Sequence, residues 1–404
     1  MRGPLRLSAR PGPLALGALL AAALATGCGD ARTQAGAEVT IDTLATGEIQ
    51  VTSPLQGQWA EGEGWQLDEE LRIGSATSEG PDLFGSIAAL AVDTEGRILV
   101  LDSQARELRF FAPDGTHLRT VGGEGGGPGE FASPVGLALD PIDGTIWVVD
   151  PGNGRYTLFT PEGDLLTTHP RPIGYFALPW PTGFTDTGAF YDVVPGGLVR
   201  LTDEAAAADT LRLPEDDSPR VRIAAADGGM LMTMVPPFGP RLHWRFDRTG
   251  HLWESTSDRF HFVRRTLDGE RNRIVRRDHE PVAVTRAEAD SIREVMEEQI
   301  GASGAGANPE VEGSLDAPPH KPAFSTFLVD DRGGLWVEPH RAADDPERRL
   351  AIFDPEGVHL GEVEVDPGLQ LVLVLPVFRD EHLYAVVTDD LDIPSVVRYR
   401  IRGR

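Results

Sequence analysis

The chain contains very little cysteine, lysine or net positive charge, and each shortage excludes a class of protein. Its 404 residues include one cysteine, Cys28, so no intramolecular disulfide can form and the fold must depend on a hydrophobic core. Its one lysine is Lys321, and 37 Lys and Arg against 63 Asp and Glu give a formal charge of −26 at pH 7. A surface this acidic repels nucleic acid and anionic lipid, so we expect neither as a partner.

Long hydrophobic runs are also absent. The longest apolar stretch, residues 13–25, has 13 residues, which is too short to span a bilayer. It follows a segment that contains three arginines and no acid, and it leads into Ala25-Thr26-Gly27-Cys28. Basic, apolar and small-residue parts in this order are typical of a secretory signal, so we expect residues 1–27 to be a signal peptide.

The residues before Cys28 resemble the lipobox of bacterial lipoproteins. That resemblance implies cleavage before Cys28, whose sulfur would carry a diacylglyceryl anchor as the only link to the membrane. Leu24 stands one place further from the cysteine than the usual lipobox leucine, so an ordinary signal peptide is the alternative. Gly29 follows the cysteine where an inner-membrane retention signal has aspartate, so we expect the outer membrane. Residues 28–40 are mostly small and polar and predict a flexible tether.

Glycine and proline are abundant instead, at 46 and 32 residues, which favours many short strands joined by turns. Residues 87–121 and 134–169 repeat one pattern: LAVD aligns with LALD at an offset of 47, and the Pro-acid-Gly turns at Pro113 and Pro161 align at 48. Each unit predicts four antiparallel strands. One such unit cannot bury both faces, whereas units arranged in a ring can, so the repeat predicts a β-propeller.

Weaker copies extend the pattern along the chain. They cover residues 178–213, 246–269 and 329–357. The C-terminal stretch 369–403 offers only three strands, and residues 70–75 align with a fourth strand that has no unit of its own. We therefore expect this N-terminal strand to complete the C-terminal blade, which closes the ring and leaves no exposed edge. The count predicts an all-β, six-bladed propeller of four-stranded antiparallel blades over residues 41–404.

The second repeat resembles an NHL-type repeat. It carries PVGLALD at residues 134–140 and IWVVD at residues 146–150, followed by Asn153, Arg155, Phe159 and Gly163. The chain after the signal is similar to bacterial six-bladed β-propeller lipoproteins. The resemblance implies a binding role more firmly than it implies any reaction.

Several motifs have a ligand-binding interpretation and a simpler structural one. The glycine-rich Gly122–Glu130 lacks the Lys-Ser/Thr ending of a phosphate loop and lies between two strands, so we interpret it as a link between blades. Asp102 and Asp150 end second strands, where aspartate more often caps a turn than binds a metal. Paired acids lack the spacing of a calcium loop. They are Asp330-Asp331, Asp344-Asp345 and Asp389-Asp390.

The histidines and one aromatic loop also have a ligand-binding and a structural interpretation. Three histidines of one repeat unit show no zinc-ligand spacing. They are His243, His251 and His261. An aromatic loop between two units is more typical of a sealed blade interface than of a stacking surface. It contains Tyr175, Phe176, Trp180 and Phe184. A lipidated Cys28 cannot act as a nucleophile. Because the acids and histidines also lack the spacing of metal ligands, we predict no catalytic residue, cofactor or metal ligand.

Residues 285–300 depart from the β pattern. Thr285 and Glu288 have the spacing of a capping box, and four apolar residues follow at helical spacing. They are Ile292, Val295, Met296 and Ile300. We predict an inserted helix, which either forms a lid over one face of the propeller or covers exposed blade surface, and we favour the second role.

Together these patterns predict a monomeric, lipid-anchored binding or scaffolding module of the cell envelope. Its partner would be a protein, a peptide or a glycan. The alternative is a metal-dependent propeller hydrolase or lyase of the gluconolactonase-like or NHL-lyase-like kind, which needs side chains from several blades to converge on a metal. We favour binding over catalysis.

Overall fold

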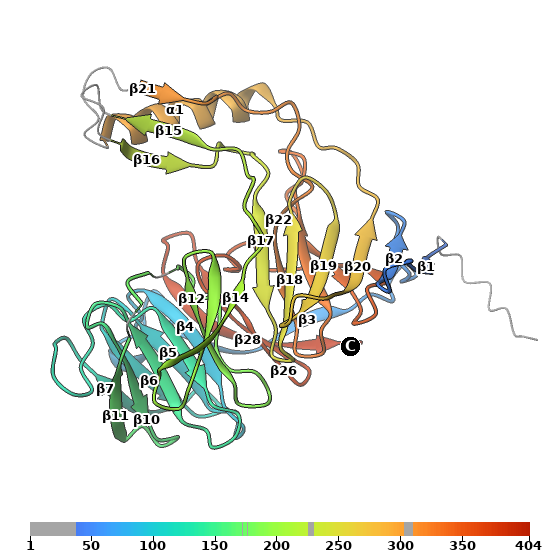
Figure 1. The fold of residues 1–404 in the computed structure, drawn as a ribbon. Coiled ribbons are helices and arrows are strands. Elements are labelled where there is room, and N and C mark those ends of the chain that lie inside the picture. Colours follow the sequence, from blue (N-terminus) through green and yellow to red (C-terminus); the bar gives the residue numbers. More distant parts are fainter. Residues whose placement is uncertain (1–37, 172, 176, 225–229, 303–309) are drawn as a thin grey trace, which may run out of the picture. The chain divides into compact units, whose positions relative to one another are not determined.

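In a computed structural model, residues 38–404 are described apart from residues 172, 176, 225–229 and 303–309. Their regular structure is almost entirely antiparallel β-sheet, as the sequence predicts (Figure 1). Within this part of the chain α1 (Arg286–Ala302) is the single α-helix, and η1 (Gly80–Asp82) is one turn of 3-10 helix. Residues 36–404 form one compact unit.

The two close sequence repeats form two four-stranded sheets. The first contains β4 (Ile87–Val92), β5 (Ile98–Asp102), β6 (Glu107–Phe111) and β7 (His117–Gly122), and the second contains β8 (Gly136–Leu139), β9 (Ile146–Asp150), β10 (Arg155–Phe159) and β11 (Leu165–Pro170). Equivalent glycines, Gly96 at φ 78° and Gly144 at φ 77°, close the first turn of each sheet. Glycine is favoured there because a side chain disfavours positive φ. The repeat therefore predicts both sheets correctly.

The third sheet has three regular strands, in the order β12 (Phe190–Val194), β13 (Gly197–Leu201) and β14 (Ala207–Arg212). A short bridge stands where the other sheets have their first strand: Phe184 pairs with Phe190, and the Tyr191 N–H donates to the Gly183 carbonyl at 3.0 Å. The weak sequence pattern over residues 178–213 thus corresponds to three strands and one bridge.

The fourth sheet is larger than the sequence predicts. It contains β17 (Leu242–Phe246), β18 (His251–Thr256), β19 (His261–Thr266) and β20 (Arg271–Arg277), extended by β1 (Thr40–Thr43) and β2 (Ile49–Ser53). β2 runs parallel to β20, with Val51 opposite Val275. The repeat does not include β1 and β2: β1 pairs with β2, and β2 joins the sheet through β20, more than 200 positions away in the sequence.

Two further four-stranded sheets follow. One contains β22 (Phe324–Val329), β23 (Leu335–Pro339), β24 (Arg349–Phe353) and β25 (His359–Glu364). The other contains β26 (Val377–Arg379), β27 (His382–Thr388), β28 (Pro394–Arg402) and, from the other end of the described chain, β3 (Gln66–Ile73). β3 pairs antiparallel with β28, and Leu71 lies opposite Arg398. The sequence predicts this pairing of residues 70–75 with the C-terminal sheet.

Buried side chains join each of these sheets to the next one along the chain. The first and second sheets share a core that includes Leu101 and Val148. At the later interfaces aromatic rings meet in pairs, with centroids 4.7 to 5.1 Å apart: Trp147 with Phe190, Tyr191 with Phe246, Phe262 with Phe327, and Trp336 with Phe378. A further cluster combines β3, β27 and β28 with β4, β5 and β6. Each sheet therefore buries both faces, as propeller blades do.

A smaller unit is inserted beside α1 (Figure 1). β15 (Val221–Ala224) pairs with β16 (Met230–Met234) and β21 (Glu310–Glu312), and Ile223 packs in a small cluster with Ile300. The predicted helix and its capping box are confirmed: the Thr285 N–H donates to the Glu288 carboxylate at 2.9 Å. Of the predicted apolar stripe Met296 is buried, whereas Val295 is 48% exposed. The three small strands had not been predicted.

Candidate ligand-binding site

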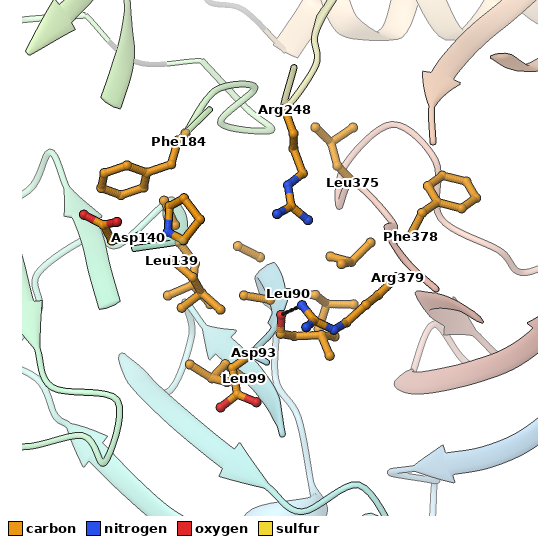
Figure 2. Close-up of a pocket in the computed structure, with 18 of the residues that line it drawn as sticks. Leu90, Asp93, Leu99, Leu139, Asp140, Phe184, Arg248, Leu375, Phe378 and Arg379 are labelled. Atoms are coloured by element: carbon orange, nitrogen blue, oxygen red, sulfur yellow. Dashed lines mark hydrogen bonds between the residues drawn. The ribbon is translucent and has the colours of Figure 1, made fainter. Parts of the chain in front are cut away.

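One cavity of about 720 Å³ is lined by all six larger sheets (Figure 2). It meets the first strand of five sheets, namely β4, β8, β17, β22 and β26, and residues 179–184 of the third sheet. Several of these first strands lie side by side: β4 contacts β8 and β26, and β17 contacts β22. A volume of this size accommodates a small organic ligand.

The walls of this cavity combine apolar side chains with charged ones. Figure 2 shows leucine and phenylalanine side chains around the empty space. They are Leu90, Leu99, Leu139, Phe184, Leu375 and Phe378. Phe184 is held by Phe190, with ring centroids 4.7 Å apart. Apolar surface beside polar groups that can fix a ligand's orientation is typical of pockets that bind organic ligands.

Aspartates mark the rim, where first strands turn into second strands. Asp93 accepts the backbone N–H groups of Glu95 and Arg97, both at 2.9 Å, and Asp330 accepts that of Gly334 at 2.8 Å. Asp247 accepts the His251 N–H at 2.9 Å in the same way. These carboxylates stabilise turns by satisfying backbone donors. The repeated Asp before a Gly-containing turn is the sequence signal for them.

Most rim carboxylates also have a side-chain partner that offsets their charge or donates a hydrogen bond to them. The Arg97 Nε lies 2.5 Å from Asp93, the Arg404 guanidinium lies 2.8 Å from Asp330, and the Trp253 indole donates to Asp247 at 3.1 Å. Asp140 has no arginine within ion-pair distance among the described residues, and burial raises its pKa.

Four arginines also line the cavity: Arg97, which pairs with Asp93, Arg245 on β17, Arg248 in the following turn, and Arg379 at the end of β26 (Figure 2 labels the last two). Arg379 donates to the Val92 carbonyl at 3.3 Å and lies 3.9 Å from the Asp380 carboxylate, and Arg248 forms an ion pair with Asp186 at 2.9 Å. Arg245 differs, because its partners are neutral.

Arg245 donates to the Trp244 carbonyl at 2.8 Å and to the Thr326 hydroxyl at 2.9 Å, and its guanidinium lies 5.5 Å from the centre of the Phe327 ring. Its Nε is buried without a hydrogen-bond partner. Within the described part of the chain, no carboxylate lies within 4.0 Å of it. Burial lowers the pKa of Arg245 to about 10. The sequence gives no signal that distinguishes this arginine from the others.

A buried network around Asp192 holds the loop that forms one wall of the cavity. The Asp192 carboxylate accepts the Tyr156 hydroxyl at 2.5 Å, the Arg171 Nε at 2.6 Å and the Trp180 indole N–H at 2.8 Å. Burial, followed by the charge of Asp192, raises the pKa of Tyr156. Trp180 is itself a lining residue, so this network positions part of the cavity wall. Sequence analysis did not find it, because its members lie in four separate segments.

The motifs singled out in the sequence have structural roles. Asp102 accepts the Gly85 N–H at 2.9 Å, and Asp150 accepts the Ser133 N–H at 2.8 Å, so both cap turns as expected. Residues 122–130 link β7 to β8, and Arg155 donates to the Gly127 carbonyl at 2.5 Å. In the aromatic loop Trp180 and Phe184 pack at a sheet interface, whereas Phe176 lies outside the described residues.

The histidines and paired acids do not converge. Burial lowers the pKa of His243 and that of His261 to about 4. Asp331 lies 2.6 Å from the Arg404 guanidinium, and Asp389 caps a turn by accepting the Leu391 N–H at 2.9 Å. Among the residues placed by the structure, no three His, Cys, Asp or Glu side chains are grouped so that they could hold a metal ion.

The predicted signal peptide and lipid anchor belong to the N-terminal part of the chain. Cys28 and residues 1–27 are outside the described residues, as is most of the predicted tether, whose last residue Thr40 begins β1. No helix in the described ranges is long and apolar enough to cross a membrane.

Comparison with known proteins supports the fold. The model of a protein family described as a 6-bladed beta-propeller, DUF5128, matches residues 81–161. No curated protein matches the chain.

Solved structures resemble it distantly. Virginiamycin B lyase from Staphylococcus aureus is 12% identical over 83% of this chain and 99% of its own, with a TM-score of 0.43. A DUF4221 family member from Bacteroides vulgatus is 11% identical over 85% and 99%, with a TM-score of 0.46. The WD40 repeats of RRP9 are 12% identical over 83% and 100%, also with 0.46. At these values the likenesses carry no inference about function. With the sheets described above, the family match makes this chain a β-propeller.

Proposed function

We propose that the protein is an exported, lipid-anchored β-propeller that binds a ligand in the cavity lined by its six larger sheets. The observation that carries the proposal is the cavity itself: about 720 Å³, with both apolar and charged side chains in its walls and residues contributed by every one of those sheets. A space of this size fits part of a peptide or a glycan rather than a folded protein. The function is therefore binding in the cell envelope.

The proposal includes a ring of six blades. Each of the six larger sheets shares a buried core with the next, and one cluster joins the sheet of β26–β28 and β3 back to the sheet of β4–β7. The pairing of β3 with β28 supports closure by the two ends of the propeller. Closure would leave no sheet edge exposed to another chain. The NHL-type pattern of residues 134–163 is consistent with this architecture.

Export and anchoring rest on the sequence alone. The basic, apolar and small-residue parts that end at Cys28 supply the signal and the acceptor sulfur. Cells fed a radioactive fatty acid should label the wild-type protein and leave Cys28→Ala unlabelled. Equal labelling of both, or labelling of neither, would remove the anchor from the proposal. Membrane fractionation of the labelled cells would then identify the outer or the inner membrane.

The binding role can be tested on arrays of peptides and glycans. Residues 36–404 form one compact unit with its own cores, so residues 28–404 with Cys28→Ser provide a lipid-free protein. Ala88 lines the cavity, and Ala88→Phe adds a ring to it. Ala207→Phe adds the same ring on the exposed strand β14. We expect the parent and Ala207→Phe to retain a ligand that Ala88→Phe loses. Retention by all three, or by none, would contradict binding in the cavity.

A further inference from the structure

Arg245 places a positive charge at the cavity with no negative charge beside it. Its guanidinium donates to a carbonyl and a hydroxyl and lies near the Phe327 ring, and all of these groups are neutral. In contrast, buried Arg171 has Asp192 at 2.6 Å, and buried Arg109 has Asp102 at 3.6 Å. The chain thus places a carboxylate beside these buried guanidinium groups, whereas half-buried Arg245 has none within 4.0 Å among the described residues.

An uncompensated cation that is partly removed from water is costly, and Arg245 is half-buried with its Nε fully buried. Removing a charge from water is unfavourable unless an opposite charge or several hydrogen bonds replace the water. Arginine remains protonated in proteins, so it does not escape the cost by losing its proton. The depressed pKa of Arg245, about 10, reflects the same burial. A bound anion would supply the missing charge and accept further hydrogen bonds from the planar guanidinium.

The surroundings of Arg245 indicate what kind of anion fits. Leu90, Leu139 and Phe378 offer apolar surface within the same cavity (Figure 2). Carboxylates such as Asp93 and Asp140 lie on the turns at the rim. Their negative charge disfavours a ligand with several negative groups, because like charges in a narrow site repel one another. One anionic group attached to an apolar body satisfies both conditions.

We propose that Arg245 is the anion-binding residue of this cavity, and that its ligand class is a small organic monoanion, a carboxylate or sulfonate on an apolar body. The inference rests on the proposed function, because it requires that the cavity bind a ligand at all. It adds that the ligand enters with its anionic group toward β17 and β22 and its apolar part along the leucine and phenylalanine walls.

Two fluorescent probes with the same aromatic rings test separately whether the cavity binds a ligand and whether it prefers an anionic one. 8-Anilinonaphthalene-1-sulfonate carries one sulfonate, and N-phenyl-1-naphthylamine has the same rings without charge. Both are titrated into residues 28–404 with Cys28→Ser, in the absence of detergent. We expect the sulfonate to bind more tightly than the neutral probe by roughly tenfold or more, as a hydrogen bond to a charged group provides.

Variants of Arg245 test whether this residue causes the preference for the sulfonate probe. Arg245→Met removes the charge at similar length, and Arg245→Gln removes it while keeping donors for the Trp244 carbonyl and Thr326. Both should abolish the preference for the sulfonate and leave the affinity for the neutral probe nearly unchanged. Arg212→Met removes an exposed arginine from β14 and should change neither affinity. Circular dichroism checks that each variant is folded.

The outcomes distinguish the inference from the proposed function. If both probes bind equally and Ala88→Phe displaces both, the cavity binds apolar ligands and the anion site is refuted. If neither probe binds, or Ala88→Phe displaces neither, binding in the cavity fails and the inference fails with it. A sulfonate preference that survives in both Arg245 variants also overturns it, since another cation would then be responsible.

Discussion

The Arg171 guanidinium and the Asp192 carboxylate lie 2.6 Å apart, and both side chains are almost completely removed from solvent. Tyr156 and Trp180 donate to the same carboxylate from two other segments. The pair therefore connects β10, β12 and the loop that forms one cavity wall. A buried charge pair is neutral as a unit. Removing one member leaves the other charge buried without a partner, which is strongly destabilising.

Asp192→Asn should destabilise the protein strongly. The substitution leaves the buried Arg171 charge without its partner, and the expected loss is about 3–5 kcal/mol of the free energy of unfolding. Urea unfolding of residues 28–404 with Cys28→Ser measures it. Asp164→Asn is the control, because Asp164 pairs with Arg119 on the surface, where such a pair contributes about 0–1 kcal/mol. Similar losses in both variants would show that Asp192 has no special role.

Ile73→Ala tests the closing strand. Ile73 is 3% exposed at the end of β3 and packs in the cluster shared with β4 and β5. If β3 completes the last blade, the cavity left by this substitution should cost about 2–4 kcal/mol in urea unfolding. Leu391→Ala, at a side chain that is 73% exposed, should cost less than about 0.5 kcal/mol. A small loss for Ile73→Ala would argue that β3 is not part of the folded ring.

Stability should fall as the pH drops from 7 to 5. His359 is 2% exposed, and burial followed by the nearby Arg277 charge lowers its pKa to about 3. The unfolded chain, with a histidine pKa near its ordinary value of 6.5, therefore binds a proton that the folded protein excludes. The stabilisation is complete above pH 6.5 and is lost as the pH falls toward the folded pKa, at up to about 1.4 kcal/mol per pH unit.

Unfolding curves at pH 7, 6 and 5 measure this slope. His359→Gln should make it shallower, because the substitution removes the titrating group. His320→Gln changes an exposed histidine and should leave the slope as it is. An unchanged slope in His359→Gln would assign the pH dependence to other groups, among them His243, whose pKa is also depressed by burial.

Lys321→Met should loosen α1 without unfolding the sheets. The Lys321 ammonium lies 2.5 Å from the Glu288 carboxylate in the first turn of α1 and donates to the Arg341 carbonyl at 2.7 Å. Its removal breaks the link between the helix and the loop after β23. Hydrogen exchange should become faster in α1 and remain unchanged in β22–β24. Arg293→Met removes the exposed pair with Asp316 and should have little effect on exchange.

Much of the fold could be predicted from the sequence, because its strongest signals are local. The glycine turns and apolar runs of residues 87–169 predict two sheets, and the same pattern indicates the role of β3 at the other end of the chain. The capping box at Thr285 and Glu288 predicts where α1 begins. The predicted turn-capping roles of Asp102 and Asp150 are likewise local, since each accepts the N–H of the residue three places further on, Ala105 and Asn153.

Other features depend on residues that only the folded chain brings together. β2 has its partner β20 more than 200 residues away, and no repeat marks it. The Asp192 network joins side chains from four segments whose spacing matches no motif. The sequence by itself therefore determined the repeated strands, their turns and the inserted helix, because neighbouring residues specify them. Only the tertiary structure decided that one arginine, Arg245, lines the cavity without a carboxylate partner, because burial and pairing are properties of groups distant in sequence.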